Sequence, residues 1–261
     1  MAKFEAAIAA MKLRGARPRK EDGRTIEAII WRLDNGAKWR SIPTELEDWH
    51  QCLSAFPPLG GWRRMGPDHG ACGRRGRAKT GVCLHRWHRD TGTPEGCRCA
   101  SEQTDTLSLR FNRNDGDDKQ ALGRSRGGLS SKIVGVCDAV GRLVDFVLVP
   151  GQAHELAASL QLLKRLPKAP AWALADMACD AAEFRSTAQA IGATPVVPSR
   201  KNARHKQPCP GVIYRHRNLI ERCWSRLKEW RAIATRYDKT ATSYAAGIAF
   251  AATLDWAKSS R

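Results

Sequence analysis

YRHRNLIERCWSRLK, residues 214–228, is the stretch of this 261-residue chain that decides its fold and its chemistry. On a helix, at about 100° per residue, four of its polar residues fall within roughly 60° of one another. These residues are Tyr214, Arg217, Glu221 and Lys228. A carboxylate beside phosphate-holding and hydrogen-bonding groups suits an enzyme that binds a divalent metal against a nucleic-acid backbone. The structural alternative is a solvated helix face with i, i+4 pairs.

Further motifs lie on both sides of this stretch. They are Leu122-Gly-Arg-Ser-Arg-Gly-Gly-Leu-Ser-Ser-Lys132, Pro150-Gly-Gln-Ala-His154, Ala175-Asp176 and Ile233-Ala-Thr-Arg-Tyr-Asp-Lys239. In their order and spacing, and together with the polar stripe, they resemble the DDE transposases of bacterial insertion sequences, in the group that includes the insertion-sequence-five type. The resemblance covers roughly residues 121 to 258.

The resemblance implies a fold and a reaction. The fold is a ribonuclease H-like α/β domain that follows a small N-terminal helical module. The reaction is the transfer of DNA strands at a phosphodiester, with two divalent ions, Mg²⁺ or Mn²⁺, at the scissile phosphate. By position, Asp176 matches the second catalytic aspartate and Glu221 the glutamate, and both would be metal ligands. For Asp176 the structural alternative is a helix N-cap after a strand.

The same resemblance indicates which residues contact DNA. Arg217 and Lys228 would hold phosphates, and Tyr214 would pack or hydrogen-bond beside them. Arg124 and Arg126, in the first upstream motif, are further candidates for DNA binding. The expected partner is double-stranded DNA at the terminal inverted repeats of the element, and the resemblance also allows a homo-oligomer.

The charge of the chain agrees with a polyanionic partner. Lys and Arg number 44 and Asp and Glu 26, so the formal net charge is +18. This excess favours nucleic acid or an anionic membrane. The longest apolar run, Ala245 to Leu254, has about half the length of a membrane span and predicts a buried helix instead. Because Met1 to Lys12 lacks the features of a signal peptide, we expect a cytoplasmic protein.

Residues 51–100 have an unusual composition. They hold Cys52, Cys72, Cys83, Cys97 and Cys99, together with His85, His88, several prolines and an Arg-rich run, without helical or strand periodicity. One interpretation is a zinc site, with ligands from Cys83, His85, His88, Cys97 and Cys99. This set lacks the paired ligands, two to four residues apart on both sides, that make zinc motifs specific.

A shifted reading frame explains this segment better. Read one base later, the codons for Ala55-Phe-Pro-Pro-Leu-Gly60 permit Arg-Phe-Arg-Arg-Trp, which resembles a family motif. Those for Leu84 to Arg98 permit Phe-Ile-Asp-Gly-Thr-Val-Ile-Arg-Ala-His-Gln-Lys-Ala-Ala, which resembles the strand of the first catalytic aspartate. The aspartate codon would straddle Arg86 and Trp87, so the chain lacks this residue. We therefore predict that residues 51 to about 118 are irregular and that the first strand is lost.

Periodicity and turn residues predict the other elements. Helices are expected at 24–36, 155–166, 181–191 and 241–257, with a further long helix around Glu221. Strands are expected at 132–137 and 143–149, joined as a hairpin, and at 171–175 and 194–198. The predicted domains are a DNA-binding-like helical module at 1–50, the irregular segment at 51–118 and an incomplete ribonuclease H-like domain at 119–261.

Two departures from the family pattern argue against activity. The first aspartate is missing, and Asp176 is followed by Met177-Ala-Cys-Asp180, where the family usually has a Gly-Tyr-Asp run. We therefore expect a degenerate, inactive copy of an insertion-sequence transposase. The alternatives are a catalytically dead DNA-binding product that inhibits an intact transposase, and a zinc-binding nucleic-acid module.

Overall fold

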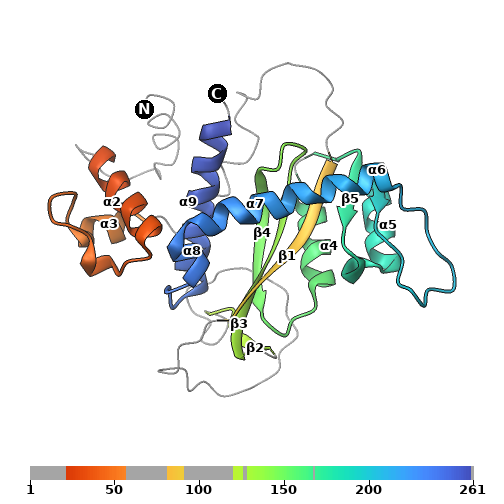
Figure 1. The fold of residues 1–261 in the computed structure, drawn as a ribbon, viewed down its shortest axis with the longest axis horizontal. Coiled ribbons are helices and arrows are strands. Elements are labelled where there is room, and N and C mark those ends of the chain that lie inside the picture. Colours follow the sequence, from red (N-terminus) through yellow and green to blue (C-terminus); the bar gives the residue numbers. More distant parts are fainter. Residues whose placement is uncertain (1–21, 57–80, 91–119, 126–127, 167, 260–261) are drawn as a thin grey trace. The chain divides into compact units, whose positions relative to one another are not determined.

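The computed structural model describes residues 22–56, 81–90, 120–125, 128–166 and 168–259 (Figure 1). Helices and a sheet occur together, which confirms the predicted α/β class. The chain forms two compact units. One is Arg74–Trp224, which holds the sheet, and the other combines Met1–Gly73 with Ser225–Arg261.

Six strands form one mixed sheet. They are β1 Gly81–Asp90, β2 Gly123–Ser125, β3 Gly128–Cys137, β4 Leu143–Pro150, β5 Trp172–Ala175 and β6 Thr194–Val196. β1 pairs with β3 in antiparallel and with β5 in parallel orientation. β6 continues the sheet parallel to β5, and β2 and β4 both pair with β3. β1 therefore lies at the centre of the sheet.

The predicted loss of the first strand is wrong. β1 pairs with β3 from Cys83 to Asp90 and with β5 from Gly81 to Leu84, inside the segment that was expected to be irregular. The helix α3, Trp49–Ala55, also enters that segment. The physical reason is that ladder hydrogen bonds use backbone groups, which every residue of this proline-free strand supplies. β1 precedes both β3 and β5 in the sequence and pairs with each of them through these groups.

The predicted hairpin between β3 and β4 is confirmed. Its turn is held by Asp138, whose Oδ1 accepts hydrogen bonds from the amides of Val140 and Arg142 at 3.0 and 2.9 Å. Gly141 adopts φ 85°, a conformation that favours glycine. The other predicted elements of this unit appear as α4 Glu155–Arg165, β5, α5 Ala182–Ala190 and β6. β6 ends at Val196, earlier than predicted, because its ladder with β5 ends there.

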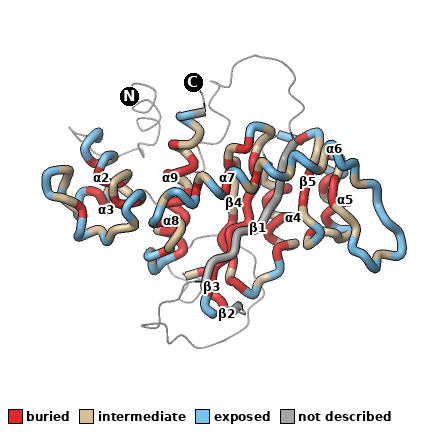
Figure 2. Tube along the Cα trace, viewed as in Figure 1, coloured by how far each residue is buried: buried red, intermediate tan, exposed pale blue. Residues whose placement is uncertain are grey.

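The two faces of the sheet are covered by different helices. Val134, Val136, Val147 and Val149 belong to the buried cluster that includes residues of α4 and α5. Gly135, between the first two of these valines, lies against the ring of Trp224 in α7, Asn218–Glu229. Figure 2 shows buried residues along β3, β4 and α4. Successive residues of β3 therefore point to opposite faces of the sheet, the valines toward α4 and α5 and Gly135 toward α7.

The second unit is helical. It contains α2 Asp22–Asn35, the short helix η1 Trp39–Ser41, α3, α8 Arg231–Thr235 and α9 Ala241–Ser259. Buried residues of α2 and α3 share one cluster with Ala232, Phe250 and Leu254. α2 ends before Gly36, which has φ 62°. The C-terminal helices therefore join the N-terminal helices, whereas the predicted domains assigned them to the sheet.

An ion pair also ties the helical unit together. Arg32 of α2 donates to Asp238, after α8, at 2.8 Å, and its guanidinium lies 4.1 Å from the ring centroid of Trp39.

The described helices include none with both the length and the apolar character needed to cross a membrane.

Candidate functional site

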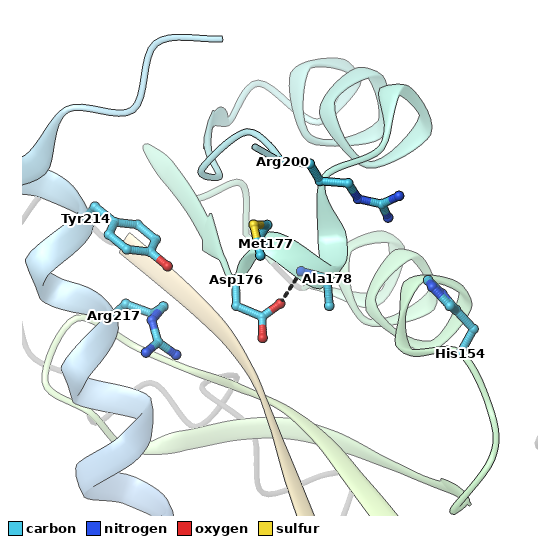
Figure 3. Close-up of a pocket in the computed structure, with 7 residues that line it drawn as sticks. All are labelled: His154, Asp176, Met177, Ala178, Arg200, Tyr214 and Arg217. Carbon is cyan, nitrogen blue, oxygen red and sulfur yellow. Dashed lines mark hydrogen bonds between the residues drawn. The ribbon is translucent and has the colours of Figure 1, made fainter. Parts of the chain in front are cut away.

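Asp176 directly follows the buried strand β5. β5 ends at Ala175, and the short helix η3, Met177–Cys179, follows Asp176. One carboxylate oxygen, Oδ1, accepts a hydrogen bond from the amide of Ala178 at 2.8 Å. The cap that we considered as a structural alternative is therefore present. Figure 3 shows the second carboxylate oxygen directed away from this cap.

A continuous helical run brings the polar stripe to Asp176. It consists of α6 Gly211–Tyr214, η4 Arg215–Arg217 and α7, so Glu221 lies on a long helix as predicted. Tyr214 and Arg217 line a cleft of about 520 Å³ together with Asp176 (Figure 3). The rest of its lining comes from His154, Met177, Ala178 and Arg200.

Arg217 connects the cleft to Glu221. Its Nη1 donates to Glu221 Oε1 at 3.1 Å, and its guanidinium lies 5.9 Å from the ring centroid of Tyr214. The Glu221 side chain is 44% exposed, so this pair contributes little to stability. The guanidinium of Arg217 instead places a positive charge at the edge of the cleft.

Two pKa shifts describe the electrostatics of the cleft. Burial raises the pKa of the Tyr214 hydroxyl, Arg217 lowers it, and the charge of Asp176 raises it further. Burial also raises the pKa of the nearby Cys179 thiol to about 11, although a hydrogen bond with Ser159 opposes this shift. At neutral pH Tyr214 is therefore a hydrogen-bond donor, and Cys179 is a neutral thiol rather than a metal-binding thiolate.

Within the described residues, no three His, Cys, Asp or Glu side chains gather where they could hold a metal. Leu84 of β1 pairs with Ala175, just before Asp176, and the next residues of β1 are His85, Arg86 and Trp87. The strand has its acidic residue at position 90, about 20 Å further along at ~3.3 Å per residue. The part of β1 beside Ala175 therefore contains no acidic residue.

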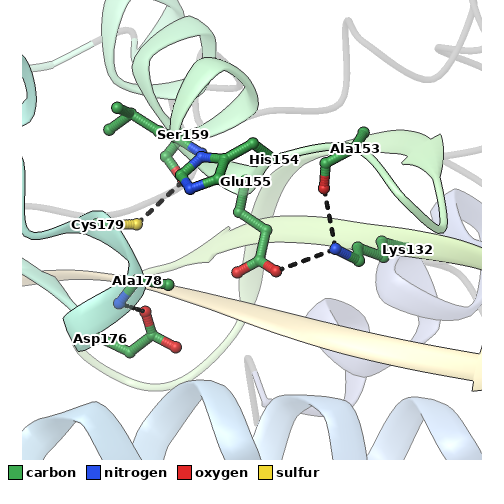
Figure 4. A network of polar contacts seen from close by, with 9 residues as sticks. Lys132, Ala153, His154, Glu155, Ser159, Asp176, Ala178 and Cys179 are labelled. Atoms are coloured by element: carbon green, nitrogen blue, oxygen red, sulfur yellow. Dashed lines mark hydrogen bonds and ion pairs between the residues drawn. The ribbon is translucent and has the colours of Figure 1, made fainter. Parts of the chain in front are cut away.

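A network of polar contacts joins β3, the start of α4 and the turn after Asp176 (Figure 4). Lys132 of β3 donates to the carbonyl of Ala153 at 2.9 Å and lies 3.4 Å from Glu155 Oε1. His154 caps α4, because its Nδ1 accepts from the amide of Leu156 at 3.3 Å. Ser159 of α4 and Cys179 of η3 are 3.5 Å apart. β3, the start of α4 and the turn after Asp176 are thus joined.

The motif from Pro150 to His154 has a packing explanation. A Cβ added at Gly151 would lie 2.0 Å from Ser130 Oγ, and one added at Gly123 would lie 1.5 Å from Gln152 Oε1. The Cβ at Gly151 would also lie 2.9 Å from the Ser130 carbonyl oxygen and 3.0 Å from that of Gly123, so this turn packs closely against backbone of the upstream motif. At Gly123 the atoms met belong to the flexible end of the Gln152 side chain. In this structure the two motifs position α4 and His154.

The predicted site residues are only partly gathered. Asp176, Tyr214 and Arg217 line the cleft, and Glu221 joins them through Arg217. Arg124 is exposed on β2, and Lys228 is exposed near the end of α7. Arg126 lies outside the described residues. Of the proposed zinc ligands, Cys97 and Cys99 also lie outside them, and for Cys83, His85 and His88 only the backbone of β1 is described.

Sequence reasoning missed His154 and Arg200 as lining residues. The motif around His154 contributed only to the resemblance, and the role of its imidazole as a helix cap had no sequence signal of its own. Arg200 begins the run Arg-Lys-Asn-Ala-Arg-His-Lys206, whose charge density is a recognisable pattern. That charge density is the sequence signal that could have identified Arg200 as a residue of the site.

Comparison with known proteins bears on this site. Residues 105–209 match the family described as Transposase DDE domain. The match supports a DDE transposase. It includes Asp176 and ends before Glu221. A solved structure described as "Mos1 transposase paired-end complex with left transposon end" is 12% identical, with a TM-score of 0.27, over 95% of this chain and 81% of that chain. No curated protein matches the chain.

Proposed function

We propose that this chain is an insertion-sequence transposase of the insertion-sequence-five type that has kept a DNA-binding cleft and has lost metal-dependent strand cleavage. The observation that carries the proposal is the composition of the cleft. Asp176 faces Tyr214 and Arg217, whereas the adjacent part of β1 holds no acidic residue. The ribonuclease H-like interpretation is supported by the central position of β1, where that fold carries its first strand.

The retained groups suit the binding of phosphates. The guanidinium groups of Arg217 and Arg200 and the hydroxyl of Tyr214 can donate hydrogen bonds to phosphate oxygens. Asp176 and Glu221 would repel the same phosphates, and Arg217 offsets the charge of Glu221. Mg²⁺ or Mn²⁺ would be the cofactor of an active relative, but two carboxylates do not hold two such ions here.

The shifted-frame hypothesis accounts for the missing carboxylate. The family match begins at residue 105, after the proposed shifted segment of residues 52–100. The shifted aspartate codon would straddle Arg86 and Trp87, close in the strand to Leu84, which pairs with Ala175. Restoring the frame would thus return an acidic residue to the part of β1 beside Asp176.

Restoration of the frame tests this proposal. We would purify the chain as written and a version with residues 52–100 translated one base later, and incubate both with duplex DNA from the element end and Mg²⁺ or Mn²⁺. We expect both to bind the DNA and only the restored version to nick it. Asp176→Asn and Glu221→Gln in the restored version should abolish nicking. Robust nicking by the chain as written would contradict the proposed inactivity.

The retained basic cleft also favours a second function, the inhibition of an intact transposase. A chain that binds element ends without cleaving them competes with an active enzyme for the same DNA. Adding the chain to an assay with the frame-restored version should therefore lower nicking in a dose-dependent way. Excess unrelated protein of similar charge is the control, and equal inhibition by that control would exclude specific competition.

A further inference from the structure

A strongly basic loop lies next to the cleft. We define the basic loop as residues 199–207, between β6 and α6, where Figure 1 shows it extending beyond the sheet. It contains four Lys or Arg residues and one His, without an acidic residue: Arg200, Lys201, Arg204, His205 and Lys206. All five are exposed. In the described part of the chain, the side chains of Lys201, Arg204 and Lys206 form no ion pair.

The basic loop is held in place at its base. Asp180 Oδ2 accepts a hydrogen bond from the Arg200 amide at 2.8 Å, and its Oδ1 accepts one from Arg185 Nη2 at 2.8 Å. Arg185 also donates to the carbonyl of Val197 at 2.9 Å. Across the loop, the amide of Gln207 donates to Ser199 Oγ at 2.9 Å. The exposed cations are therefore presented on an ordered base.

The anchor belongs to the turn that carries Asp176. Asp180 directly follows η3, and Arg200 lines the cleft with Asp176 (Figure 3). Positive charge thus continues from Arg217 in the cleft to Arg200 and then along the exposed loop. A polyanion that occupies the cleft and extends past Arg200 would meet Lys201, Arg204 and Lys206 next.

We propose that the basic loop binds the backbone phosphates of duplex DNA that extends from the cleft. This inference rests on the proposed DNA-binding function and adds a contact surface to it. Exposed Lys and Arg side chains contact phosphates without reading the base sequence, and each neutralised phosphate steepens the salt dependence of binding. The loop therefore contributes affinity equally on element-end and unrelated duplexes.

The test compares two triple variants of the full chain that lose the same charge. One is Lys201→Ala/Arg204→Ala/Lys206→Ala in the basic loop, and the matched control is Lys164→Ala/Lys168→Ala/Lys258→Ala at exposed positions elsewhere. Binding to element-end and unrelated duplexes is measured over a salt series. At about 0.9 per phosphate, the loop variant should lose about 2 to 3 from the slope of log K against log salt. It should bind about 10- to 100-fold more weakly than the control at moderate salt.

The outcomes separate this inference from the proposed function. If the native chain binds no DNA, both fail. If the native chain binds and the two triple variants weaken binding equally, only net charge matters and the loop proposal is wrong. A loss confined to element-end DNA would also overturn it, because that would show base readout. Circular dichroism of both variants shows whether each remains folded.

A second pair of variants tests the anchor with the opposite sign of charge. Asp180→Asn raises the net charge by one, so unspecific attraction alone would tighten DNA binding. Because this change loosens the base of the loop, we expect binding to weaken about 2- to 5-fold relative to Asp34→Asn, which adds the same charge at an exposed position. Equal or tighter binding by Asp180→Asn would show that the ordered base is not used.

Discussion

At the scale of single residues, Asp180 shows how a partly exposed chain segment is fixed by one carboxylate. Burial by itself would raise the pKa of this carboxyl group. The hydrogen bonds from Arg185 and from the Arg200 amide, with the positive charges of both residues, outweigh that effect and lower the pKa. The structural role of Asp180 can be read directly from these bonds.

The lowered pKa of Asp180 leads to a prediction on stability. The stabilisation from the ionised carboxylate is present above its ordinary pKa of 3.8 and is lost as the pH falls through the lower folded-state value. Asp180→Asn should therefore cost about 1–3 kcal/mol at pH 7, and the difference from the native chain should shrink as the pH falls below the ordinary pKa of 3.8 and through the lower folded-state pKa. Urea denaturation over a pH series measures this difference. A cost that does not change with pH would contradict the assignment.

Gly135 provides a second prediction at this scale. A Cβ at this position would lie 2.7 Å from two atoms of the Trp224 ring. Gly135→Ala should therefore destabilise the sheet unit by about 1–3 kcal/mol through overpacking. The control is Gly211→Ala, where nothing lies within 4 Å of the added Cβ. Thermal denaturation of both variants is the measurement, and an equal effect would show that α7 does not press on β3 as described.

At the scale of elements, the junction of β3 and α4 depends on a buried ion pair. The side chains of Lys132 and Glu155 are 10% and 8% exposed, and the Lys132 ammonium also binds the carbonyl of Ala153. Such a pair is costly to break on one side only, because the remaining charge stays buried. The pair fixes the first turn of α4 and, with it, His154 at the cleft.

A double-mutant comparison tests this junction. Lys132→Met should lower the free energy of unfolding by about 3–5 kcal/mol, because Glu155 is left buried without its cation. Lys132→Met/Glu155→Gln removes both charges and should recover a large part of that loss. Urea denaturation at neutral pH measures the free energies. The single variant Glu155→Gln is measured as well. If the double variant loses as much free energy of unfolding as the two single variants lose together, the ion pair is not the source of the effect.

At the scale of the whole molecule, the central position of β1 unites the sheet. β3, β1 and β5 are consecutive strands of one sheet, so their amides should become exposed together in one cooperative opening. We predict that hydrogen exchange protects residues 81–90 as strongly as β3 and β5, while residues 199–207 exchange fast. Mass spectrometry of peptides from the exchanged chain measures this. Fast exchange in residues 81–90 beside a protected β3 would contradict a central strand.

The sequence by itself determined the local elements and the stripe that carries Tyr214, Arg217 and Glu221. Periodicity, turn residues and a glycine stop act over a few residues, so the β3–β4 hairpin, α4, α5 and α9 could all be predicted. It also determined that no aspartate stands at Arg86 or Trp87.

Only the tertiary structure decided the rest, because it depends on contacts between distant residues. Residues 81–90 become a strand through backbone bonds to β3 and β5, which their side-chain pattern does not reveal. The helices of the C-terminus join those of the N-terminus through a shared core. Asp180 meets the Arg200 amide across the intervening α5 and β6, and this bond brings the basic loop to the cleft. Sequence patterns are local, whereas pairing and packing are set by the whole fold.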